Sequence, residues 1–296
     1  MTDFWIIATG TLVAVNCGLI GVFLILRRMA MVGDAISHAV LPGIVAAYLI
    51  SNSRNSLIML LGAAVFGMLT TFLIELFYKR ARLQADASIG ITFTWLFAIG
   101  VIMVSLFSGN VDLDQDCVLY GDIAYVPFDL IYYNESNLGP APFWLQSGNL
   151  LAVLGLIIFG YRGLFITSFD ESFARGLGIS TGSWHYALMA AVSVTVVLSF
   201  NAVGAILVVA FLVVPPAAAY LISKSLHAMI LLTSLFGAIS AIGGFYLADW
   251  WSSSISAGMA VAAGIIFVIV FLFTAFRNAV WRKTHRKSFE KYELAD

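Results

Sequence analysis

The chain has 296 residues, of which 61% are hydrophobic and only 10% are charged. A soluble domain typically has about 25% charged residues, and one water-soluble core of this length cannot bury so large an apolar excess, so much of the surface must face lipid. The net charge of −1 excludes the basic field that is typical of nucleic-acid-binding proteins. Cys17 and Cys117 form no CxxC or Cys/His spacing, which argues against a disulfide framework or a zinc finger.

Hydrophobic runs long enough to cross a bilayer recur along the whole chain. A helix needs about 20 residues to cross about 30 Å of hydrocarbon, and such runs cover residues 4–26, 29–50, 57–78, 87–107, 148–166, 184–202, 204–222, 228–248 and 255–276. Only a turn near residues 201–204 separates the sixth and seventh runs, so one span with a re-entrant segment is the alternative there. We therefore predict an all-α integral membrane protein, a polytopic bundle of eight or nine transmembrane helices.

The basic residues indicate which way this bundle faces. Arg27 and Arg28 follow the first run, instead of preceding it as in a cleaved signal peptide, so we expect that run to remain a span. With an external N-terminus and nine alternating spans, 14 of the 15 Lys and Arg residues are cytoplasmic and only Arg54 is external. The enrichment of these residues in cytoplasmic loops thus predicts one transmembrane domain, residues 1–276, and a basic cytoplasmic tail, residues 277–296.

The longest connection, residues 108–147, is external in this orientation and acidic. We interpret it as a solvated loop; an acidic rim that attracts cations or contacts an external partner is the alternative. Its acidic residues are Asp112, Asp114, Asp116, Asp122, Asp129 and Glu135.

Asp34 and His38 fall within the second hydrophobic run, where an ionisable residue is a functional hypothesis by default. A spacing of four places both side chains on one helix face. There a carboxylate and an imidazole can share one divalent ion such as Mn²⁺, Zn²⁺ or Fe²⁺; an Asp–His hydrogen bond that only joins helices is the alternative. Two ligands do not complete a metal shell, so we expect a second copy of the chain to bring two more across a two-fold axis.

Three prolines interrupt the spans. Pro42, which precedes Gly43, removes the donor for the carbonyl of His38, and free backbone of this kind is tolerated where it lines a cavity. Pro215 and Pro216 free two carbonyls of the seventh run in the same way. We interpret the two sites as pore-lining kinks or hinges.

Other polar residues near span ends have simpler interpretations. Glu75 precedes Lys79 by four residues, a spacing that predicts an ion pair at the end of the third span. His185 and His227 lie at span ends and are interpreted as interfacial residues.

The cytoplasmic segment between the fifth and sixth runs, residues 167–183, predicts a short helix. Ser168 or Asp170 can cap its N-terminus, and Gly176 or Gly178 can stop it. Three apolar residues recur every four positions, so their aligned side chains predict a docking surface for a partner, with contact to the membrane interface as the alternative. They are Phe169, Phe173 and Leu177. The chain has no GxxxxGK[ST] phosphate loop, so any ATP-driven transport requires an ATPase on another polypeptide.

Several blocks together resemble the manganese/zinc/iron permeases of bacterial ABC importers, in order from about residue 5 to residue 276. The first and fourth are the most specific. The blocks are residues 33–43 (GDAISHAVLPG), 86–90 (DASIG), 119–123 (LYGDI), 169–179 (Phe169-Asp170-Glu171 through Ala174 to Gly178-Ile179) and 203–207 (VGAIL) with Pro215.

This resemblance implies a subunit of the bacterial inner membrane that transports a divalent metal and is not itself an enzyme. It implies a second permease chain, identical or related, two cytoplasmic ATPases and an external metal-binding protein, with no permanently bound cofactor. Asp34 and His38 match the residues taken to coordinate the metal in the pathway. The residues that match the helix docking on the ATPase are Phe169, Asp170, Glu171, Phe173, Ala174, Arg175 and Gly178.

An ion-coupled secondary transporter that works without an ATPase is the main alternative. Such proteins usually carry more intramembrane carboxylates and often show inverted repeats, and the sequence shows neither feature. A cation channel or an intramembrane enzyme is disfavoured by the lack of a filter-like loop and of catalytic pairs.

Overall fold

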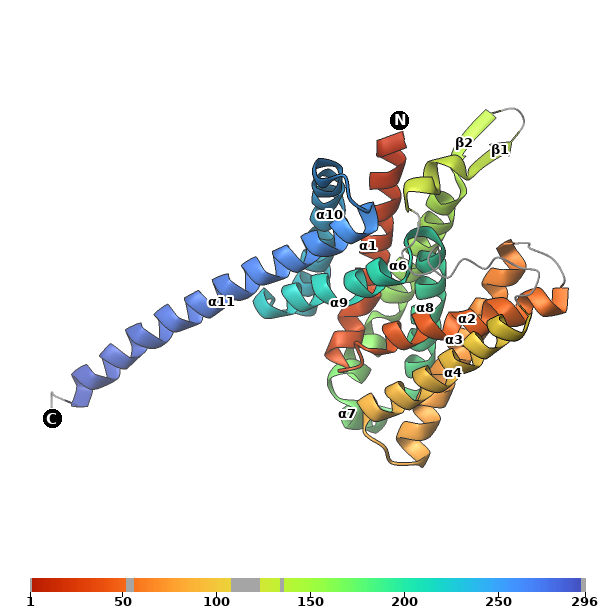
Figure 1. Cartoon of the computed structure of the whole chain (residues 1–296). Helices are drawn as coiled ribbons and strands as arrows, with labels where there is room; N and C mark the ends of the chain where they lie inside the picture. Colours follow the sequence, from red (N-terminus) through yellow and green to blue (C-terminus); the bar gives the residue numbers. More distant parts are fainter. Residues whose placement is uncertain (1, 52–55, 108–122, 134–135, 294–296) are drawn as a thin grey trace.

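The computed structural model of the chain describes residues 2–51, 56–107, 123–133 and 136–293, which are mostly helical. Helices α1 (Thr2–Leu26), α2 (Val32–Ser51), α3 (Ser56–Arg80) and α4 (Ala85–Phe107) come first (Figure 1). A 3-10 turn, η2 (Ile123–Phe128), and an antiparallel hairpin of β1 (Leu130–Tyr133) and β2 (Ser136–Pro140) follow. The remaining helices are α6 (Ala141–Phe169), the short α7 (Glu171–Gly176), α8 (Thr181–Val203), α9 (Ala205–Ile222), α10 (Leu226–Trp251) and α11 (Ile255–Glu293).

Nine helices in the described ranges are long and apolar enough to cross a membrane, which confirms the predicted all-α class. Both α8 and α9 are among them. They are separate helices because Gly204 between them has a φ of +83°, a conformation that glycine adopts without the steric cost of a Cβ. The 18 residues of α9 reach about 27 Å at 1.5 Å per residue. Of the eight or nine predicted spans, nine therefore fits the helix lengths in the described ranges.

The connection before α6 is shorter than the sequence predicted. Residues 141–147, predicted as loop, form the first turns of α6, with a proline at its N-terminus. Proline is tolerated there because the first N–H groups of a helix have no helical partner, so Pro142 is compatible with a helix start. Of the predicted acidic rim the structure describes only Asp129, and the other five residues lie outside the described ranges. Backbone of the predicted tail continues α11 as far as Glu293.

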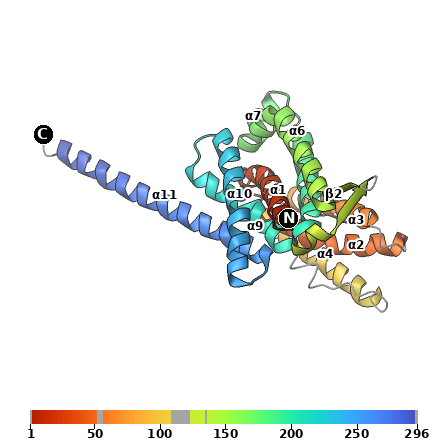
Figure 2. The same ribbon diagram turned by 90° about the horizontal axis from the view of Figure 1, so that it is seen from above.

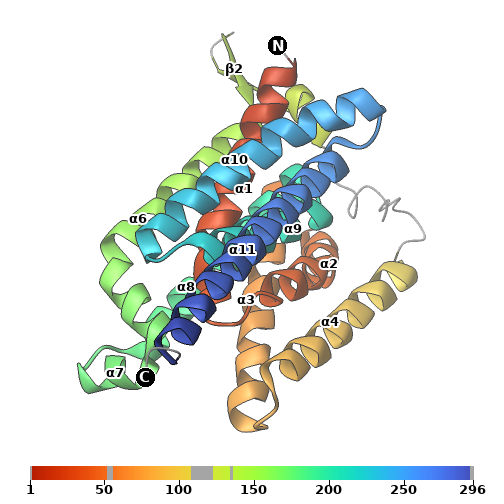
Figure 3. The same cartoon turned by 90° about the vertical axis from the view of Figure 1, so that its left-hand side faces the viewer.

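The helices connect two opposite ends of the molecule. Figure 3 shows the N-terminus and the β-hairpin at one end, and α7, the turn between α3 and α4 and the C-terminus at the other. Helices α2, α3 and α4 lie together on one side, and α9, α10 and α11 lie on the other, with α11 extending away from its neighbours (Figures 1 and 2). We call α2, α3 and α4 the three-helix group.

Buried polar side chains join α1, α6 and α8. Asn16 Nδ2 donates to the backbone oxygen and to Oε1 of Gln146, at 3.0 and 2.9 Å. Gln146 donates to Ser199 Oγ at 3.4 Å, and Asn149 donates to Thr195 Oγ1 at 3.2 Å. Hydrocarbon offers no water to such groups, so they pair with one another across helices. These contacts hold α1, α6 and α8 against one another.

The three-helix group packs through glycines around Pro42. A Cβ on Gly43 would lie 2.6 Å from the carbonyl oxygen of Gly62, and a Cβ on Gly62 would lie 2.6 Å from that of Gly43. A Cβ on Gly100 would lie 2.8 Å from Pro42 Cδ. Small residues thus allow the backbones of α2, α3 and α4 to approach closely. Pro42 and Gly43 are buried in this contact, and their role as a hinge stays a prediction.

Helices α1 and α9 approach closely at the second proline site. Pro216 cannot donate to the carbonyl of Leu212, and a Cβ on Gly21 would lie 2.0 Å from that oxygen. Both prolines are buried, and the same Cβ would lie 2.9 Å from Pro216 Cγ. Because Gly21 has no side chain, α1 can approach the Leu212 carbonyl, which Pro216 leaves without a helical donor. A hinge at Pro215 and Pro216 stays a prediction.

Gly21→Ala is expected to destabilise the fold by about 3 kcal/mol, the upper range for overpacking, because backbone must move to admit the methyl group. Thermal unfolding of the detergent-solubilised chain measures this loss. Gly155→Ala in α6 is the matched control, since its Cβ would enter open space. Equal midpoints for the two variants would show that α1 can shift at little cost.

Candidate metal site and its surroundings

Asp34 and His38 lie on the first turns of α2, as the spacing predicted. Asp34 is in the first turn of the helix, where the partial positive charge of the N-terminus favours a carboxylate. Its Oδ1 lies 3.5 Å from His38 Nε2, and the two side chains are 34% and 27% exposed. The imidazole packs on Phe93 and Phe97 of α4, with ring centroids 5.0 and 5.5 Å away. The pair is thus half-buried, oriented and still accessible.

The distance between the two atoms suits shared coordination. Two ligands about 2.1 Å from one ion lie about 3.4 Å apart at a tetrahedral angle, close to the observed 3.5 Å. The residues that the structure describes contain no group of three or more His, Cys, Asp and Glu side chains that could hold a metal. Within those ranges Asp34 and His38 therefore form a pair without a third such side chain beside them, and further ligands from a second chain stay a prediction.

The predicted short helix is α7, and its capping explains where it begins and ends. Asp170 is the N-cap, because its Oδ1 accepts the backbone N–H of Phe173 at 2.9 Å, whereas Ser168 belongs to α6. At the other end the Ile179 N–H bonds the Ala174 carbonyl and the Gly178 N–H bonds the Arg175 carbonyl. This is a Schellman motif, which places Gly178 at the left-handed position with a φ of +74°.

The side chains of this segment divide into buried and exposed sets. Ala174 is fully buried, and Arg175 pairs with Glu171 at 2.8 Å on the outside. Phe169 ends α6 instead of belonging to the short helix. The three apolar residues of the predicted stripe are exposed: Phe169 at 59%, Phe173 at 58% and Leu177 at 55%. An exposed apolar surface therefore exists at this end of the molecule.

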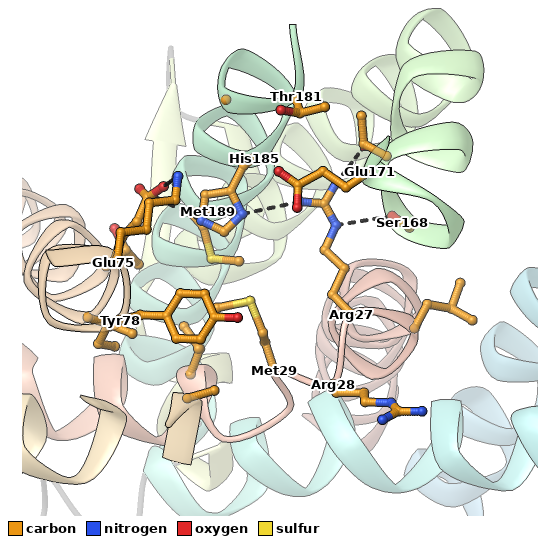
Figure 4. Close-up of a pocket in the computed structure, with 18 of the residues that line it drawn as sticks. Arg27, Arg28, Met29, Glu75, Tyr78, Ser168, Glu171, Thr181, His185 and Met189 are labelled. Atoms are coloured by element: carbon orange, nitrogen blue, oxygen red, sulfur yellow. Dashed lines mark hydrogen bonds and ion pairs between the residues drawn. The ribbon is translucent and has the colours of Figure 1, made fainter. Parts of the chain in front are cut away.

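A cavity of about 490 Å³ separates this segment from the three-helix group. Figure 4 shows the Arg27 guanidinium between His185 and Ser168, with Glu75 across the cavity. Arg27 Nε donates to Ser168 Oγ at 3.1 Å, and an Nη donates to Thr167 Oγ1 at 2.9 Å. The other Nη lies 3.3 Å from His185 Nδ1. Arg27 thus joins the end of α1 to α6 and α8.

Glu75 is buried in α3 at the far side of this cavity. It forms an ion pair with Lys79, which confirms the predicted pairing. Its Oε2 also lies 3.9 Å from His185 Nε2, so His185 faces the cavity between two charged groups and is not merely interfacial. Sequence reasoning missed this arrangement, because nothing in the local pattern joins positions so far apart in the chain. The one available signal was a carboxylate inside an otherwise apolar run.

Known proteins similar to this chain indicate its family. The model of the ABC 3 transport family matches residues 2–274. The chain is 45% identical over 289 residues to the manganese transport system membrane protein MntD of Bacillus subtilis, covering 98% of each chain. It is 39% identical over 278 residues to the zinc transport system membrane protein TroD of Treponema pallidum, covering 94% of this chain and 75% of that one.

A solved structure supports the same assignment. PsaBC from Streptococcus pneumoniae, in complex with a Fab, contains a chain that is 31% identical, with a TM-score of 0.74 and 90% of each chain covered. The family match thus spans nearly the whole helical bundle, including α2 and α7. This chain belongs to the ABC 3 transport family.

Proposed function

We propose that the chain is the membrane-spanning permease subunit of an ABC importer for a divalent transition metal, and that the ion passes by Asp34 and His38. The observation that carries the proposal is the half-buried carboxylate–imidazole pair, 3.5 Å apart, on α2. Placing ionisable side chains within a membrane span costs free energy, so residues of this kind usually have a function. Family membership and relatives named for manganese and zinc transport support the choice of cargo.

The ligand set accommodates Mn²⁺, Zn²⁺ and Fe²⁺, because one carboxylate and one imidazole are borderline in hardness. A second permease chain, identical or closely related, completes the site with its own pair across the pathway. The shortage of ligands within the described residues of one chain supports this pairing. Four ligands from two chains would hold the ion and still allow its release.

ATP hydrolysis takes place on separate cytoplasmic ATPase subunits. Each docks on the exposed apolar side chains of α7 and the end of α6. The bundle lies in the bacterial inner membrane with its N-terminus outside and the α7 end in the cytoplasm, so that the basic residues at that end face inward. An extracytoplasmic binding protein delivers the ion at the opposite end, near the hairpin.

Reconstitution into proteoliposomes tests the proposal. We expect Mn²⁺ or Zn²⁺ uptake only when the permease, its ATPase, the metal-loaded binding protein and ATP are all present. Metal-loaded binding protein should also stimulate ATP hydrolysis by the assembled complex. Full uptake by the permease alone, driven by an ion gradient, would instead identify a secondary transporter.

A further inference from the structure

The joint between α1 and the three-helix group is the starting point of the inference. Polar contacts hold α1, α6 and α8 together, while the three-helix group carries Asp34 and His38. The chain passes from one unit to the other through residues 27–31, where Arg28 has a φ of +58°, a conformation uncommon for a residue with a side chain. A movement of α2 relative to α1 must therefore change the backbone of residues 27–31, next to Arg27.

Arg27 is anchored at this joint by neutral groups. Its hydrogen bonds reach Thr167 and Ser168 in the last turn of α6, and His185 of α8. Burial lowers the pKa of the Arg27 guanidinium by more than the nearby Glu171 carboxylate raises it, but the arginine stays charged. The guanidinium thus ties the joint directly to the elbow between α6 and α7.

Arg27 also fixes the protonation of His185. A guanidinium can only donate hydrogen bonds, so His185 Nδ1 accepts one and the neutral ring carries its proton on Nε2. That proton faces Glu75 Oε2 at 3.9 Å, longer than a hydrogen bond, so this contact can tighten or open with little rearrangement. The same proton blocks Nε2 as a metal ligand, which argues against a second metal site at Glu75 and His185.

We propose that Arg27 is a positioning residue that transmits the displacement of α7 to the three-helix group, through His185 and Glu75 and through its own backbone link to α2. The inference rests on the proposed function, since α7 moves only if an ATPase docks there. The structural support is continuity: α6 and α7 meet at Asp170, two residues after Ser168, and Arg27 precedes Asp34 by seven residues. Binding at α7 thereby changes the placement of the metal ligands.

The test is Arg27→Gln in the complete transporter, reconstituted with its ATPase and supplied with Mn²⁺ by its binding protein. We expect the variant to keep its thermal midpoint, to co-purify with the ATPase and to hydrolyse ATP at the basal rate. The number of Mn²⁺ ions imported per ATP should fall about tenfold. Arg162→Gln in α6 is the control, because this exposed arginine lies outside residues 27–31 and does not line the cavity, and it should import like the parent.

A second variant keeps the inference testable if Arg27→Gln fails to fold. Thr167→Val combined with Ser168→Ala removes the acceptors on α6 and should give the same tenfold fall, with no further loss when all three changes are combined. An import ratio equal to that of the parent in either variant would overturn the role of Arg27. Uptake by the parent without any ATPase would instead overturn the proposed function.

Discussion

Replacing Asp34 or His38 with alanine is expected to lower the initial rate of Mn²⁺ or Zn²⁺ uptake by about 100-fold or more, with normal membrane insertion. Loss of a residue that only supports a metal ligand already costs about 10- to 100-fold in affinity, and here the ligand itself is removed. In a pair of identical chains each substitution removes two ligands at once. Uptake of radioactive metal into proteoliposomes containing the complete transporter measures the effect.

Two control substitutions separate metal binding from general damage. Asp86→Ala removes an exposed carboxylate from the first turn of α4, and His227→Ala removes an exposed imidazole near the start of α10. Both should change uptake by no more than about twofold, as is usual for surface sites. Parental uptake in Asp34→Ala and in His38→Ala would show that the pair only joins helix turns.

Phe173→Asp is expected to lower import strongly by weakening the docking of the proposed ATPase, while the permease itself stays folded. The side chain is 58% exposed, so the change introduces a charge into the proposed docking surface without disturbing the core. It falls in the first turn of α7, where an acidic residue suits the helix N-terminus. Co-purification with the ATPase and ATP-dependent uptake should both fall by about tenfold or more, as for the loss of an aromatic anchor worth about 2 kcal/mol.

Ser172→Asp is the matched control for this substitution. It adds the same charge one residue earlier, at another exposed position of α7, and leaves the apolar side chains in place. Phe173→Leu should restore most of the import, because it keeps an apolar contact. Wild-type import in Phe173→Asp would place the docking surface elsewhere.

Local patterns in the sequence were enough to predict much of this architecture. The helices that can span a membrane are visible because each must bury its backbone hydrogen bonds within one apolar run. The geometry of Asp34 and His38 follows from their spacing of four on a single helix, and Asp170 could be predicted as a cap because the cap contacts lie within three residues. The start of α6 was missed, since prolines at positions 140 and 142 indicate a loop and a helix start equally well.

Contacts between distant segments could not be predicted in this way. Arg27 meets Ser168 and His185 across 141 and 158 residues of chain, and no periodicity within one element carries that information. Because Arg27 is next to Arg28, the sequence suggested only that this basic pair lies on the cytoplasmic side of the first span. The close approach of Gly21 to the carbonyl of Leu212 could not be predicted either, because a glycine in an apolar run does not by itself indicate a contact with another helix.

Both proposed metal ligands belong to consecutive turns of one helix, and this has a consequence for how cargo is released. The backbone of α2 sets the spacing of Asp34 and His38, and α4 orients the imidazole, so movement of α2 and α4 as one body leaves their 3.5 Å separation unchanged. Affinity must then be switched by how many further ligands or water molecules reach the ion. Each chain would keep its own pair of ligands together through the transport cycle, and the ion would leave when the pairs of the two chains separate.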